Sequence, residues 1–141
     1  MESYAWKFFS SIENKNVQVP AFFEPKPFTK ENLGYLYKVE PVMNENKISF
    51  FIPIDYVEKK HDTWPADYIS HCIGHEGKGS LLSALIAKDL AISLSSYQDN
   101  MLNSLSYLMI SVTLTDKGLK DYEEVVKMTY AYVNMLKEVG P

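Results

Sequence analysis

The chain has 141 residues, of which 46% are hydrophobic, so it is long enough for one domain with a buried core and too short for two. Its formal net charge is −4, and all 14 of its cationic side chains are lysine. This balance disfavours nucleic-acid binding, which normally needs a basic surface, and without arginine the chain has no bidentate donor for phosphate or carboxylate groups.

Targeting and redox signals are few. No run approaches the ~18–20 apolar residues of a membrane span, and no signal peptide opens the chain, so we expect no membrane partner. The single cysteine, Cys72, cannot form an internal disulfide, and nothing else indicates an oxidising compartment. A cytoplasmic location is compatible with these features.

The beginning of the chain predicts a helix followed by a linker. Residues 3–13 have the aromatic and aliphatic density of a helix end, and the polar residues 14–16 break that pattern. The prolines that follow cannot continue a helix, and the aromatic rings among them predict a segment that packs along a surface (Pro20, Phe22, Phe23, Pro25, Pro27 and Phe28). We place a domain boundary near Pro20.

The middle of the chain predicts two strands and two helices. Residues 33–40 and 47–54 are rich in β-branched and aromatic residues and are joined by a short polar loop, so we expect an antiparallel pair. Trp64-Pro65 predicts the start of a helix with apolar residues at helical spacing, interrupted near residues 77–79 (Tyr68, Ile69, Cys72 and Ile73). Ser80 predicts the N-cap of a second, short helix.

The last part predicts two more strands and a long helix. Strand patterns cover residues 90–98 and 104–115, with residues 95–97 at an exposed edge. Apolar residues then recur at helical spacing and predict a core-facing side (Leu119, Tyr122, Val125, Val126, Thr129, Tyr132, Val133 and Leu136). The predicted order is β-β-α-α-β-β-α, an α+β fold with an antiparallel or mixed sheet and helices on one face.

His71 and His75 stand four residues apart on one face of a predicted helix, as the metal-binding histidines of zinc peptidases do. The catalytic carboxylate is missing, because Gly74 occupies the position before the second histidine. The other common zinc motif, His-Glu-x-x-His, has a histidine three residues after the glutamate. Here the third residue after Glu76 is Gly79. Two interpretations stay open: a weak zinc-binding pair, or one imidazole on a backbone carbonyl and the other lining a cleft.

Two neighbouring patterns predict no chemistry of their own. Residues 77–80, Gly-Lys-Gly-Ser, look like a phosphate-binding loop, but the glycine spacing is too short and a helix precedes them, so we expect no nucleotide. Cys72 lies among apolar neighbours, and we expect it to be buried and not nucleophilic.

The segment His71 to Ser83, HCIGHEGKGSLLS, resembles the insulinase, or pitrilysin, family of zinc metallopeptidases, and within it the insulin-degrading enzymes. The similarity runs along nearly the whole chain, through shorter matches (residues 8–17, 27–28, 36–38, 51–54, 114–115 and 140–141). The resemblance implies a longer zinc endopeptidase that repeats one α+β domain of the LuxS/MPP-like metallopeptidase type four times. Its zinc motif lies in the first copy.

This chain resembles the second copy, which implies that zinc and hydrolysis belong to a first domain absent here, with no catalytic or metal-binding residue in this segment. Residues 1–19 would be the C-terminal helix and linker of the catalytic domain. Residues 20–141 would be the N-terminal part of the second, non-catalytic domain. The alternative is a catalytically silent scaffold or assembly subunit of the same superfamily.

The resemblance also implies an exosite that holds the N-terminus of a peptide substrate (His71, Gly74, Glu76, Leu94, Ser95 and Ser96). In this role, Glu76 would pair with the α-amino group, Gly74 would allow close backbone approach, and residues 94–96 would accept an extended peptide as an added strand. In the family, glycines occupy at least some of the positions that correspond to residues 95–97. The strand edge of this chain is therefore bulkier than that of the family. The other interpretation of Glu76 is a solvated charge at a helix end. The expected partners are peptide substrates and the remaining domains of the same chain.

Overall fold

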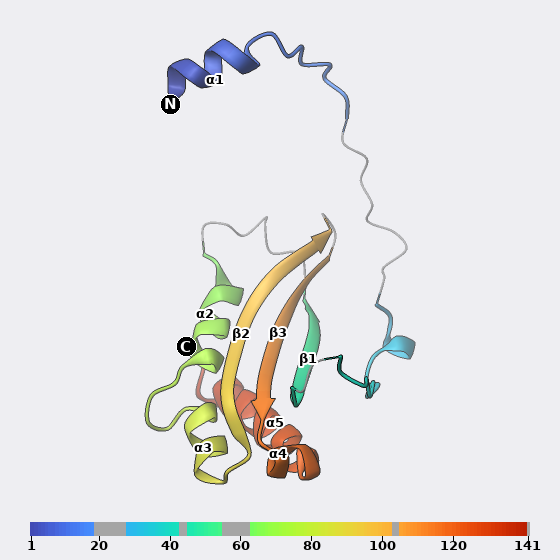
Figure 1. The fold of residues 1–141 in the computed structure, drawn as a ribbon, viewed down its shortest axis with the longest axis vertical. Helices are drawn as coiled ribbons and strands as arrows, with labels where there is room; N and C mark the ends of the chain where they lie inside the picture. Colours follow the sequence, from blue (N-terminus) through green and yellow to red (C-terminus); the bar gives the residue numbers. More distant parts are fainter. Residues whose placement is uncertain (19–27, 43–44, 55–62, 103–104, 141) are drawn as a thin grey trace.

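A computed structural model describes residues 1–18, 28–42, 45–54, 63–102 and 105–140 (Figure 1). The first elements are a helix, α1 (Glu2–Phe9), and a single 3-10 turn, η1 (Lys30–Asn32). A strand and two helices follow: β1 (Lys47–Ile54), α2 (Pro65–Gly74) and α3 (Leu81–Ala87). Two strands and two helices complete the fold: β2 (Ala91–Leu102), β3 (Leu105–Leu114), α4 (Asp116–Lys120) and α5 (Tyr122–Val139).

The three strands form one antiparallel sheet in the order β1-β3-β2, so β3 is central and β2 lies at an edge. In this sheet Ile110 of β3 stands between Phe50 of β1 and Ser96 of β2. The α+β class, the antiparallel sheet and the edge position of residues 95–97 are thereby confirmed. β1 has the predicted bounds, because its alternating apolar residues match the two-residue period of a strand.

One face of the sheet carries the core. Ile110 and Val112 of β3 are fully buried and pack with residues of three helices, among them Ile73 of α2, Leu85 of α3 and Val125 of α5. The helices therefore cover the face toward which the even-numbered residues of β3 point, as predicted (Figure 1). Within the described residues, no helix combines the length and apolar character needed to cross a membrane.

The opposite face, which no described helix covers, carries aromatic rings. Phe51 of β1 stacks on Tyr107 of β3, its diagonal neighbour, with ring centroids 4.4 Å apart, and Phe28 packs against Phe51 at 5.4 Å. The prediction that the aromatic residues after the linker pack along a surface holds for Phe28. The other residues of that prediction, together with the boundary near Pro20, lie outside the described residues.

The predicted strand over residues 33–40 is wrong. These residues are exposed and have no strand partner, and β1 pairs with β3 instead. Strand propensity needs cross-strand neighbours to become a strand, and none packs against these residues in the described chain. The order of elements from residue 45 onward is therefore β-α-α-β-β-α-α, in which the first predicted strand is missing and the last helix is divided.

Two predicted helix faces also need correction. In α2 the buried residues are Ala66, Ser70 and Ile73, whereas Tyr68 and Ile69 are exposed, because the small residues allow α2 to lie close to the sheet. In the last helical region, the chain breaks at Asp121 between α4 and α5, and Leu119 is exposed. The remaining predicted positions are at least partly buried, with Val125 and Thr129 fully buried.

Candidate functional site

All six residues that the sequence nominates for substrate binding line one shallow, open pocket of about 390 Å³. The pocket lies between the C-terminal end of α2, the loop that follows it and the middle of β2. Two residues not nominated, Ser70 and His75, complete the lining. A signal for both was present, because Ser70 stands four residues before Gly74 and His75 stands four residues after His71.

The pocket exists because α2 ends close against the edge strand. A Cβ added to Gly74 would lie 3.5 Å from the backbone nitrogen of Ser96 and 3.6 Å from its Cβ. These are ordinary contacts, so a methyl group fits at Gly74, although a longer side chain would be directed at β2. The close neighbour of Gly74 is therefore Ser96 of this chain, and the two residues form part of the pocket wall. The Oγ of Ser96 is buried, without a hydrogen-bond partner in the described residues.

The polar side chains at the mouth of the pocket are exposed. The imidazoles of His71 and His75 have ring centroids 6.2 Å apart, and the ring of His75 folds back over Gly77. Neither imidazole, nor the carboxylate of Glu76, forms a hydrogen bond or ion pair within the described part of the chain. The interpretation in which one histidine caps a backbone carbonyl is therefore wrong here, and both histidines line the cleft.

The donor set does not suit zinc. Among the residues that the structure describes, no group of three or more His, Cys, Asp or Glu side chains is placed to hold a metal ion. A structural or catalytic zinc site needs at least three protein ligands, which His71 and His75 alone do not supply. Nearby Cys72 is only partly buried, and its carbonyl oxygen accepts a hydrogen bond from the Tyr132 hydroxyl of α5.

The second wall of the pocket is the edge of the sheet. β2 pairs with β3 along one side, and in the described residues no strand pairs with its other side. An edge strand offers a row of unpaired backbone N–H and C=O groups, which can receive an extended peptide as a further strand. Leu94, Ser95 and Ser96 lie on this edge directly beside the end of α2.

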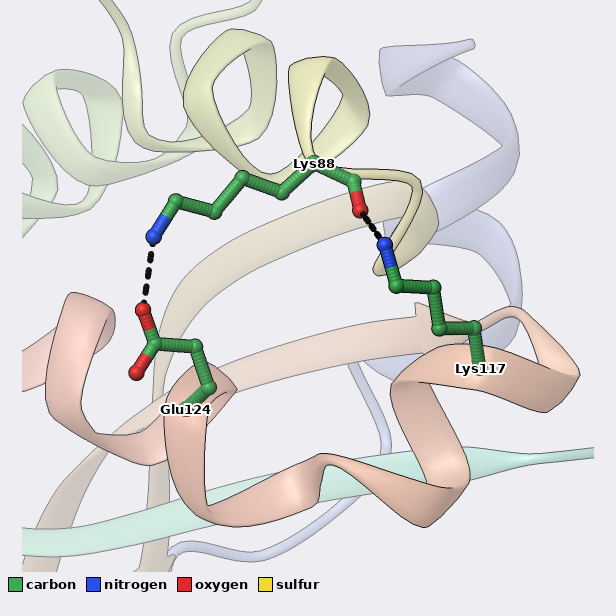
Figure 2. A network of polar contacts seen from close by, with 3 residues as sticks. All are labelled: Lys88, Lys117 and Glu124. Carbon is green, nitrogen blue, oxygen red and sulfur yellow. Dashed lines mark hydrogen bonds and ion pairs between the residues drawn. The ribbon is translucent and has the colours of Figure 1, made fainter.

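The far end of α3 meets β2 in a region that we call the junction, formed by residues 88–90, residues 115–118 and Glu124. Figure 2 shows Lys88 with two contacts: its ammonium group donates to Glu124 of α5 at 2.6 Å, and its carbonyl accepts from the Lys117 ammonium at 2.6 Å. The Thr115 hydroxyl donates to the carbonyl of Asp89 at 2.7 Å, and the Thr115 backbone N–H donates to the carbonyl of Leu90. These contacts hold the turn that leads from α3 into β2.

Two further features hold the junction. The hydrogen bond from Lys88 and its positive charge lower the pKa of Glu124 below its ordinary value. Gly118 packs so closely on the turn that an added Cβ would overlap the carbonyl oxygen of Leu90. Because that oxygen belongs to the backbone, no side-chain rotation can relieve such an overlap.

Comparison with known proteins identifies the chain. The family model for the peptidase M16 inactive domain matches residues 1–141. The chain belongs to this peptidase family. The Schizosaccharomyces pombe protein mug138, described by its name as a candidate zinc protease, is 33% identical over 140 residues, which cover 99% of this chain and 14% of that protein.

Two further relatives agree. Insulin-degrading enzyme of Homo sapiens is 37% identical over 135 residues, which cover 96% of this chain and 13% of the enzyme. The crystal structure of pitrilysin matches with a TM-score of 0.68 and 28% identity over 72% of this chain and 11% of the pitrilysin chain. The resemblance to the insulinase and pitrilysin family is thus confirmed, and the chain spans only 13–14% of the length of the two relatives matched by sequence.

Proposed function

We propose that this chain is part of the second, non-catalytic domain of an insulinase-family zinc endopeptidase, and that it anchors the N-terminus of a peptide substrate in the pocket between α2 and β2. In this account residues 1–19 end the catalytic domain and residues 20–141 begin the second. Zinc and hydrolysis belong to the first domain. The observation that carries the proposal is the gathering of all six nominated residues around one pocket, beside a strand edge with which no described strand pairs.

The charges of the pocket suit an ammonium group. Glu76 supplies a carboxylate without a partner among the described residues. The pocket also lies at the C-terminus of α2, where the helix dipole places partial negative charge. In contrast to α3 and α5, α2 has no backbone N–H bond at its C-cap in the described residues, so carbonyl oxygens of its last turn can accept hydrogen bonds from a ligand.

The strand edge supplies affinity that does not depend on the peptide sequence. An extended peptide added to β2 forms main-chain hydrogen bonds, so many sequences can bind while the α-ammonium group fixes the register. A tethered N-terminus limits which peptide bonds can reach a distant catalytic centre, so anchoring contributes to catalysis by positioning. The serines at positions 95 and 96 leave the backbone of the edge available, since side chains alternate above and below the sheet.

The test is binding of a fluorescent peptide to the chain, measured by anisotropy at pH 7.5 with a free or an acetylated N-terminus. We expect the free peptide to bind about tenfold more tightly, as one charge-assisted hydrogen bond near the surface allows. Glu76→Gln should abolish this difference, and Glu123→Gln, which removes an exposed carboxylate at the start of α5, should preserve it. Equal affinities of the two peptides for the unaltered chain would refute the anchoring role.

The scaffold alternative predicts a different outcome. A silent assembly subunit needs no peptide site, so neither peptide would bind at any concentration compatible with a folded chain. In the longer protein, cleavage of peptides that a chelator abolishes would support the endopeptidase, and the absence of cleavage by the well-folded protein would support the scaffold.

A further inference from the structure

We propose that the anchored peptide carries an aromatic residue among its first three residues, and that this ring packs against Tyr97 on the aromatic face of the sheet. The aromatic face is the one that no described helix covers. This inference rests on the proposed function, and it names the class of peptide that the pocket selects.

The aromatic face joins the pocket through β2. Ser95 lines the pocket, and Tyr97 points to the same side of the sheet, because side chains alternate along a strand. The strand register continues both positions as rows across the sheet. One row is Ser95, Ser111 and Ser49, and the next row is Tyr97, Met109 and Phe51. A row of short side chains therefore begins at the pocket, and a row of large ones stands beside it.

The row of large side chains is exposed at its outer end and supported at its inner end. Tyr97 is 46% exposed and Phe51 is 36% exposed. Phe51 packs on both Phe28 and Tyr107, and the Tyr107 hydroxyl donates to the carboxylate of Asp99 at 3.2 Å. The Tyr97 hydroxyl makes no hydrogen bond within the described residues. The inner rings are thus held in place, while the ring of Tyr97 on the edge strand is available to a ligand.

A peptide added to β2 would bring a side chain to this row whichever way the peptide runs. The peptide residue opposite Ser95 would point to the aromatic face, with Tyr97 as a diagonal neighbour. Diagonal neighbours on paired strands lie about 7–8 Å apart, which an aromatic side chain can span. The serine row is short, so a ring of the peptide can lie over it and meet Tyr97.

The anchored N-terminus limits which peptide residue this is. The α-ammonium group would be held beside residues 94–96, and a strand advances about 3.3 Å per residue. The residue opposite Ser95 is therefore one of the first three of the peptide. A contact between two aromatic rings there should strengthen binding about fivefold.

The experiment uses short peptides of Gly, Ser and Thr with a single Phe at position 1, 2 or 3 and a fluorescent label at the C-terminus, with binding measured by anisotropy. We expect Phe to tighten binding about fivefold at position 2 only, or at positions 1 and 3 but not 2, because side chains of an added strand alternate. Tyr97→Ser should remove this gain, and Tyr97→Phe should keep it. Tyr68→Ser is the matched control and should also keep it, since Tyr68 is an exposed tyrosine of α2 that does not line the pocket.

The outcomes that overturn the inference are distinguishable from a failure of the anchoring role. If Phe gives no gain at any position, or an equal gain at all three, while the preference for a free over an acetylated N-terminus persists, the aromatic subsite is refuted and the anchoring role stands. The absence of that preference refutes the anchoring role, and the aromatic subsite with it.

The row of large side chains could instead serve packing within the chain or between two copies. In that case Tyr97→Ser would leave the Phe gain intact, and would lower the urea midpoint or dissociate a dimer in sedimentation experiments. Either result would refute the aromatic subsite.

Discussion

The pocket and the junction lie at opposite ends of the unit formed by α3 and its flanking loops, and they use polar groups in opposite ways. At the junction, the polar groups of Lys88, Thr115 and Lys117 are engaged within the chain by short hydrogen bonds. At the pocket, His71, His75 and Glu76 are exposed and make none in the described residues. Satisfied polar groups stabilise a fold, whereas unsatisfied ones at a surface are available to a ligand.

The comparison predicts that substitutions at the junction change stability, and that substitutions in the pocket change binding. The largest expected effect is that of Gly118→Ala. Its new Cβ would overlap the backbone carbonyl of Leu90, so we expect the free energy of unfolding to fall by about 3 kcal/mol in urea denaturation. Gly74→Ala is the matched control and should stay within about 1 kcal/mol, since its Cβ makes only ordinary contacts. Equal losses in both variants would contradict the contrast.

A substitution of Ser80 tests how much its side-chain cap stabilises the start of α3, the end nearer the pocket. Its buried hydroxyl accepts a hydrogen bond from the backbone N–H of Ser83 at 3.1 Å and so caps the helix. Ser80→Ala should lower the free energy of unfolding by about 1 kcal/mol, measured in the same way. Ser83→Ala keeps the N–H donor and removes only the hydrogen bond from the Ser83 hydroxyl to the Ser80 carbonyl at 2.9 Å, so a larger loss there than at Ser80 would refute the capping assignment.

The ion pair of Lys88 with Glu124 is a smaller and pH-dependent test. The Glu124 carboxylate has a lowered pKa. The ion pair therefore contributes to folding stability above the ordinary pKa of a glutamate, and this contribution is lost as the pH falls through the lowered pKa. We expect the urea midpoint of Lys88→Ala to lie slightly below that of the unaltered chain at pH 7, with a smaller difference at pH 3. A constant difference at both pH values would show that Lys88 acts through packing instead.

Glu76→Gln should have the smallest effect on stability. The side chain is exposed and has no partner in the described residues, so the free energy of unfolding should change by less than about 0.5 kcal/mol. The same variant should lose the preference for a free N-terminus. A large loss of stability would show that Glu76 stabilises the fold, as the junction residues do, and would argue against a role in binding.

The sequence predicted those features of the fold that depend on residues close to one another in the chain. The start of α2 at Pro65 and the cap at Ser80 depend on residues within one helical turn, and both were predicted. The strand at residues 47–54 was predicted from its β-branched and aromatic residues, and it has the predicted bounds. The six site residues came from the family resemblance, whereas His75 was named from the sequence only as a zinc partner of His71 or as part of a cleft, and not for peptide binding.

The errors arise where distant contacts decide the structure. Residues 33–40 have strand-like composition but no neighbour to pair with in the described chain. The last helix divides at Asp121, next to the segment where Gly118 packs on Leu90, two residues that lie far apart in sequence. The buried stripe of α2 combines Ile73 with the small residues Ala66 and Ser70, which let the helix lie close to the strand.

The most direct test of the central claim is a titration of the isotopically labelled chain with a peptide that has a free N-terminus, followed through its backbone amide NMR signals. The account predicts that the signals of His71, Gly74, Glu76 and residues 94–96 shift, while those of Lys88, Leu90 and Gly118 stay in place. Shifts confined to the junction or to β1, with the pocket signals unchanged, would contradict it.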